Sequence, residues 1–150
     1  MASTLTRLLV HATFSTKNRE PLIDAAHEPD LYAYIGGICR NMGSPLLTIG
    51  GVSDHVHLLV SLGKSVCVSD LMLNVKKDSS RWMNEHNQSA TRFGWQDGYF
   101  AFSIGESGVD ALRRYIDGQK AHHATVDFKD ELRGILGKYG IDWDERFIWS

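Results

Sequence analysis

The sequence predicts an α+β protein with a ferredoxin-like (split βαβ) fold, in which helices cover one face of an antiparallel sheet. Segments with strand-like and helix-like periodicity follow one another in the order strand, helix, strand, strand, helix, strand, which is the order of that fold. No internal repeat, low-complexity segment or linker divides the 150 residues. We therefore expect one domain over residues 1–150, extended by a tyrosine-bearing helix and a C-terminal helix.

The first half of the chain supplies the first three strands and the first helix. Residues 5–14 alternate apolar and polar side chains, which predicts a strand with one buried face. A helix is predicted from Pro29, a residue favoured in a first helical turn, to Gly43, a common C-terminal stop. Residues 46–52 and the segment that begins at His55 follow as two strands of a hairpin.

The second half adds the remaining elements. Ser69 is predicted to cap a second helix, which should end near residues 84–87. Residues 95–104 alternate again and predict the fourth strand. Helical spacing then predicts a third helix over 109–123 and a fourth over 127–139.

Composition favours an ordinary soluble globular protein, because 43% of the residues are hydrophobic and 23% are charged. Cys39 and Cys67 are the only cysteines, so a reducing cytoplasm fits best. No signal segment or membrane-spanning run is recognisable, and no membrane partner is expected. The net charge of −2 argues against a protein that coats nucleic acid indiscriminately, but it allows a local basic site.

The triplet His55-Val56-His57 is the first candidate for chemistry. Side chains alternate along a strand, so both imidazoles point to one face while Val56 points to the other. Two imidazoles at this spacing can share a divalent metal, with Asp54 as a partner that orients them. Alone, such a pair is more often a partly exposed polar face.

Tyr115 and Gln119 are the second candidate. They lie one helical turn apart and share a face of the predicted third helix. A tyrosine can attack a phosphodiester, but its pKa of about 10 makes it a weak nucleophile at neutral pH. A metal held by His55 and His57 could bind the scissile phosphate, with the Gln119 oxygen completing a site that suits Mg²⁺ or Mn²⁺. Viewed alone, Tyr115 fits a packed aromatic on a helix surface.

Four segments together resemble the single-tyrosine HUH transposases of bacterial insertion sequences of the IS200 type. They are Phe14 to Arg19, Asp54 to Val60, Lys76 to Trp82, and Tyr115 to Gln119. They occur in the same order as in that family, and the resemblance covers nearly the whole chain.

The resemblance implies a metal-dependent transposase that cleaves and transfers single-stranded DNA at hairpin-flanked element ends. By position, Tyr115 corresponds to the nucleophile that forms a 5′-phosphotyrosine, and His55, His57 and Gln119 correspond to the metal ligands. Members of the family are commonly homodimers, in which the tyrosine helix of one subunit completes the histidine site of the other. A domesticated relative that processes repetitive hairpins fits the same residues.

Basic residues are candidates for contacts with DNA phosphates. They are Lys17, Arg19, Lys76, Lys77 and Arg81. A solvated surface is the simpler interpretation of each cluster. The competing hypothesis for the whole protein is a non-catalytic ferredoxin-like module that binds nucleic acid, in which the histidines and Tyr115 are merely surface groups.

Overall fold

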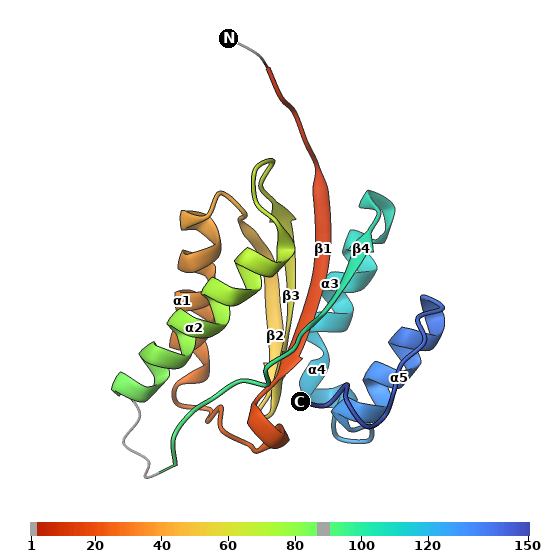
Figure 1. Cartoon of the computed structure of the whole chain (residues 1–150). Helices are drawn as coiled ribbons and strands as arrows, with labels where there is room; N and C mark the ends of the chain where they lie inside the picture. Colours follow the sequence, from red (N-terminus) through yellow and green to blue (C-terminus); the bar gives the residue numbers. More distant parts are fainter. Residues whose placement is uncertain (1–2, 87–90) are drawn as a thin grey trace.

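A four-stranded antiparallel sheet forms the centre of the computed structural model, which describes residues 3–86 and 91–150 (Figure 1). The strand order is β2-β3-β1-β4, so β1 and β3 are central neighbours, as in the ferredoxin-like topology that the element order predicted. The strands are β1 (Leu8–Ser15), β2 (Leu46–Val52), β3 (His55–Leu62) and β4 (Phe100–Ile104). The predicted ferredoxin-like α+β fold is confirmed.

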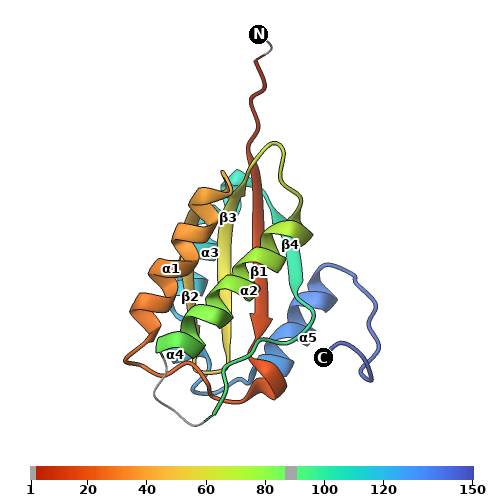
Figure 2. The same cartoon turned by 60° about the vertical axis from the view of Figure 1, so that its left-hand side comes forward.

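Helices α1 (Glu28–Asn41) and α2 (Val68–His86) lie side by side on one face of the sheet (Figure 2). They enclose the main core, in which Phe14, Val56 and Leu58 from the sheet are fully buried. Gly43 follows α1 at a positive φ of 63°, a conformation that favours glycine and ends the helix where predicted.

The opposite face, which the sequence predicted to be open, is covered. Helices α3 (Val109–Asp117), α4 (Gln119–His122) and α5 (Phe128–Lys138) lie on this side (Figure 1). Ile116 of α3 packs on Leu9 and Leu59, and Phe128 of α5 packs on Phe102. Both faces of the sheet are therefore buried, and the expectation that β1 has a single buried face is wrong.

Four predicted boundaries differ from the structure, and one of them is the start of the first strand, which lies at Leu8 and not at residue 5. The fourth strand begins at Phe100, because Trp95 makes only an isolated bridge to Thr16 and its ring packs edge-on against Phe14. The predicted third helix is interrupted at Gly118, whose φ of −91° and ψ of 11° separate α3 from α4. Ser69 lies inside α2 and does not cap it.

The other helix ends agree with the predictions. Asp127 caps α5, since its side chain accepts a hydrogen bond from the Asp130 amide at 2.8 Å. The second helix ends at His86 as predicted, and Asn87 of the predicted end segment lies outside the described residues. In the described part of the chain, no helix combines the length and apolar character needed to cross a membrane. Two short 3₁₀ turns complete the fold, at Lys17–Arg19 and Glu106–Gly108.

A pair of leucines in α2 tests the assignment of the core. Leu71 is fully buried, whereas Leu73 is 62% exposed. Leu71→Ala should lower the free energy of unfolding by about 2–5 kcal/mol, because it removes buried methyl groups and leaves a cavity. Leu73→Ala, the matched control, should change it by less than about 0.5 kcal/mol in urea denaturation. Equal effects of the two substitutions would contradict the packing of α2 on the sheet.

Candidate active site

The central strands bring three histidines together on the face covered by α3 and α5. His55 and His57 are fully buried on β3, and His11 is 5% exposed on β1. Nε2 of His11 lies 2.8 Å from Nδ1 of His57. Nδ1 of His55 lies 2.7 Å from the Asp54 carboxylate, the orienting contact that the sequence suggested. The two β3 histidines thus share a face as predicted, but inside the protein.

The tyrosine helix lies against these histidines within the same chain. The ring of Tyr115 contacts the ring of His57 at a centroid distance of 5.7 Å. Gln119 is 1% exposed, and its Oε1 lies 2.9 Å from Nε2 of His55. The two groups that were predicted to share a helical face therefore meet the two predicted histidines, despite the interruption at Gly118.

A close backbone approach holds α3 on the sheet. A Cβ atom built on Gly50 of β2 would lie 2.4 Å from the Ile116 carbonyl oxygen, so only glycine fits there. Ile116 follows Tyr115 directly. The absence of a side chain at Gly50 therefore lets the tyrosine reach the histidines.

Glu131 of α5 joins all of these groups and was missed by the sequence analysis. Its carboxylate accepts hydrogen bonds from the Tyr115 hydroxyl and from Nε2 of Gln119, the latter at 3.0 Å. Its Oε1 lies 2.9 Å from Nε2 of His57 and 3.1 Å from Nε2 of His123. A signal was available, because Glu131 is spaced three and four residues from Phe128 and Ile135 and so interrupts the apolar stripe of its helix.

Burial and the Glu131 charge determine the electrostatics. Burial would raise the pKa of Glu131, but contacts with His123 and His57 hold its pKa far below the usual range. Burial lowers the pKa of His57 despite Glu131, and burial together with His57 lowers the pKa of His11 to about 3. For His123, burial lowers the pKa, but Glu131 outweighs it and the net shift is upward. Glu131 is therefore ionised, while the lowered pKa values of His57 and His11 favour their neutral forms.

Burial and the hydrogen bond to Glu131 raise the pKa of the Tyr115 hydroxyl above its usual value. The hydroxyl is thus neutral at physiological pH, with its proton directed at a carboxylate. Attack by this oxygen requires loss of that proton, and Glu131 is placed to receive it.

The contacts of His55 fit a bound cation. Its Nδ1 faces Asp54 and its Nε2 faces the Gln119 oxygen, and both partners are acceptors. A neutral imidazole has one N–H, so facing both acceptors favourably requires a positive charge at the ring, which either a second proton or a bound metal ion supplies. Exchanging the oxygen and nitrogen positions of the Gln119 side-chain amide does not help. Its oxygen would then face the Glu131 carboxylate, which is also an acceptor and now receives a hydrogen bond from the Gln119 nitrogen. A divalent metal bound to Nε2 of His55 would remove this conflict.

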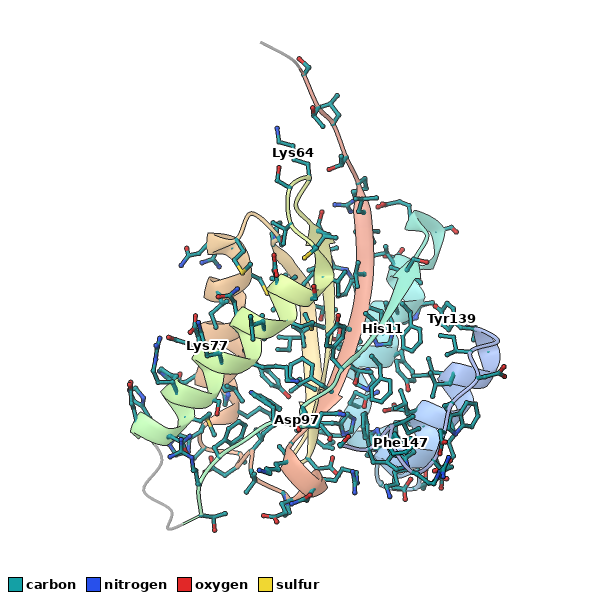
Figure 3. All side chains as sticks on the ribbon, in the orientation of Figure 1. His11, Lys64, Lys77, Asp97, Tyr139 and Phe147 are labelled. Carbon is teal, nitrogen blue, oxygen red and sulfur yellow. The ribbon has the colours of Figure 1, made fainter. Side chains whose placement is uncertain are left out.

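A cavity of about 590 Å³ between α3 and α5 leads to the site. Tyr115, Glu131 and His11 line it, with apolar walls that include Leu112 and Ile135. Figure 3 shows His11 and Tyr139, another lining residue, on the same side of the sheet. The nucleophile candidate is therefore accessible from solvent, although the histidines of β3 are not.

A basic groove of about 780 Å³ runs along α2 and the segment that follows it. Four of the five predicted DNA-contacting residues line it: Lys17, Lys76, Lys77 and Arg81. Arg92 adds a further cation that the sequence analysis did not single out. The aromatic side chain of Tyr99 also lines it. The groove thus combines charge for phosphates with an aromatic ring.

Three of the predicted contacts have partners within the chain, and one of them is Arg81, whose Nη2 lies 3.5 Å from the Asp78 carboxylate. The Lys76 ammonium donates to the backbone carbonyls of Asp97 and Gly98, at 2.7 and 2.8 Å. Arg19 lies outside the groove and donates to the Trp149 carbonyl at 3.2 Å. Lys17, Lys77 and Arg81 are exposed on the groove and are the better candidates for DNA contacts.

An antiparallel α+β sheet that carries paired histidines beside a tyrosine helix, together with a basic groove, is an arrangement suited to processing DNA. The family model described as "Transposase IS200 like" matches residues 4–119. The chain belongs to this family of transposases, and the resemblance stated from its motifs is confirmed. Comparison with curated proteins found no match.

Solved structures similar to this chain include two transposases. One is a candidate transposase from Deinococcus radiodurans R1, with a TM-score of 0.63, 21% identity, and coverage of 79% of this chain and 95% of the other. The second is a REP-associated tyrosine transposase bound to a REP hairpin, with a TM-score of 0.62, 15% identity, and coverage of 84% and 76%. At these identities the similarity supports the shared fold.

Substitution of Gly50 tests how the tyrosine helix is held. Gly50→Ala should push α3 from β2 and lower the free energy of unfolding by roughly 1–3 kcal/mol, because the new methyl group would overlap the Ile116 carbonyl. Gly37→Ala in α1 is the control, since a Cβ there meets no atom within 4 Å. The control should be neutral or stabilising by up to about 1 kcal/mol. Urea denaturation would measure both, and an unaffected Gly50→Ala protein would exclude this close approach.

Proposed function

We propose that the protein is a metal-dependent transposase that cleaves and rejoins single-stranded DNA beside hairpins, with Tyr115 as its nucleophile. The observation that carries the proposal is the convergence of Tyr115, Gln119 and the two β3 histidines at Glu131. Membership of the transposase family supports DNA as the substrate. The similar structure bound to a REP hairpin supports a hairpin as the recognised form.

In the proposed reaction, the Tyr115 oxygen forms a bond to the scissile phosphorus and the bond to the 3′ oxygen breaks. The phosphate stays on the 5′ side as a phosphotyrosine, and the departing oxygen takes a proton to become a 3′-hydroxyl. The hydroxyl proton of Tyr115 passes to Glu131, which already accepts its hydrogen bond. Attack of a 3′-hydroxyl on the phosphotyrosine would reverse these bond changes and rejoin the DNA.

His55, His57 and Gln119 are the proposed holders of a divalent cation, Mg²⁺ or Mn²⁺. When bound, the cation would neutralise the charge that develops on the phosphate. Asp54 and His11 keep the two imidazoles in place by contacting their Nδ1 atoms. The single chain already carries both halves of this site, so the exchange of tyrosine helices in a homodimer stays a prediction.

Two other functions fit the same structure. A domesticated relative that processes repetitive hairpins would use the same chemistry, and the hairpin-bound neighbour favours keeping this alternative. A non-catalytic hairpin-binding module would need only the basic groove. The two enzymes and the non-catalytic module differ in one observable, because only the enzymes would form a covalent link between Tyr115 and DNA.

Tyr115→Phe tests the nucleophile. Labelled hairpin oligonucleotides from the flanks of the gene would be incubated with the protein and Mn²⁺ or EDTA, then run on a denaturing gel. The wild type should form a slowly migrating adduct with Mn²⁺ only. Tyr115→Phe should form none, because it lacks the attacking oxygen, while it still binds the hairpin.

Tyr34→Phe is the matched control, since Tyr34 lies on α1 and stacks on Trp82. This variant should form the adduct as the wild type does. An adduct in Tyr115→Phe would remove Tyr115 from the proposed role. Hairpin binding by the wild type with no adduct would favour the non-catalytic module.

Lys77→Ala tests the groove. Lys77 lies on the outer side of α2, whereas Lys64 lies at the far end of the molecule (Figure 3). Loss of one phosphate contact should weaken hairpin binding and reduce the slope of log affinity against log salt by about 0.7. Lys64→Ala should leave that slope unchanged in titrations at several salt concentrations. Identical slopes for the two variants would place the DNA elsewhere.

A further inference from the structure

We propose that, in the protein without DNA, His123 and Glu131 complete the metal site as ligands beside His55 and His57, while Gln119 holds Glu131 through its amide hydrogen bond instead of binding the ion. The inference rests on the proposed function, since it concerns the cation which that function requires. The family match ends at residue 119, so both additional ligands come from the segment that follows it. The metal site would then include residues outside the segment that the family model matches.

The geometry centres on one carboxylate oxygen. Oε1 of Glu131 lies 2.9 Å from Nε2 of His57, 3.1 Å from Nε2 of His123 and 3.5 Å from Nε2 of His55. One ligand atom from each of the four residues lies within 4.8 Å of all the others. Ligand atoms that share one ion at bond lengths of about 2.0–2.2 Å lie about 4 Å or less from one another. Small side-chain rotations would therefore bring these four atoms into coordinating positions.

His123 gives the second, independent observation. Its side chain is 6% exposed, and its Nε2 is buried without a hydrogen-bond partner among the described residues. By contrast, both ring nitrogens of His57 have partners, in His11 and Glu131. Buried polar atoms are nearly always satisfied, so a ring nitrogen that lies 3.1 Å from a carboxylate oxygen without a hydrogen bond to it is a candidate metal ligand.

The two oxygens of Glu131 have different neighbours. Oε2 accepts from the Tyr115 hydroxyl and from the Gln119 amide, while Oε1 faces the imidazoles. Through Oε1 the carboxylate can bind the ion while Oε2 still positions Tyr115. Glu131 would therefore connect the metal to the nucleophile through a single side chain.

The ligand types predict which ion binds best. Three imidazoles and one carboxylate suit Zn²⁺ or Co²⁺, whereas Mg²⁺ prefers oxygen ligands and six-fold coordination. We therefore expect Zn²⁺ and Co²⁺ to bind more tightly than Mg²⁺. The ion that binds most tightly need not be the one that supports DNA cleavage.

Titration of the full-length protein with Co²⁺ tests the ligand set. Visible absorption reports both affinity and coordination, because four-coordinate Co²⁺ absorbs more strongly than six-coordinate Co²⁺. His123→Ala and Glu131→Gln should each weaken Co²⁺ binding at least about tenfold. Loss of a residue that only orients a metal ligand already weakens binding by about that factor, so loss of a ligand should cost no less. Each should also lose the intense four-coordinate bands. His86→Ala is the matched control, because His86 is exposed at the end of α2.

The inference is overturned if both variants keep a folded circular dichroism spectrum and bind Co²⁺ as tightly as the wild type. If Glu131→Gln does not fold, His123→Ala decides alone. Failure of the inference is separable from failure of the proposed function. Unchanged Co²⁺ binding with normal adduct formation in His123→Ala would reject only the added ligands. Weakened Co²⁺ binding in the variants, with no adduct in the wild type, would reject only the transposase chemistry.

Discussion

The buried carboxylate of Glu131 is the interaction on which the rest of the site depends. Taking a charge out of water is costly unless it is paired and hydrogen-bonded. Here the compensation comes from His57 on β3, Tyr115 on α3, Gln119 on α4 and His123 just beyond it. The sheet, the tyrosine helix and the C-terminal helix are thus held together by the same group that organises the candidate chemistry.

Local periodicity was sufficient to predict much of this arrangement. The two-residue period of a strand places His55 and His57 on one face, and one helical turn places Tyr115 beside Gln119. The element order then makes β1 and β3 neighbours, which brings His11 to the same face. Each step depends on spacing within a few residues or on a strongly constrained topology, so each can be read from the sequence.

The remaining features depend on packing between distant segments, which periodicity does not encode. Nothing near the histidines indicates that α5 will cover them, so their complete burial was not predicted. His123 and Glu131 approach the site only because Phe128 and its neighbours dock on β4. Likewise, the sequence favours Arg19 as a DNA contact, but its guanidinium donates a hydrogen bond to the backbone carbonyl of Trp149, far along the chain.

The cover over the histidines also restricts the shape of what can reach Tyr115. The cavity beside it, at about 590 Å³, is of the size that proteins use for small ligands, which is roughly 300–1,000 Å³. Its walls come from both α3 and α5, so a stacked and paired duplex would meet the helices before its backbone met the hydroxyl. Under the proposed function, this shape favours a DNA strand that presents unpaired nucleotides to Tyr115.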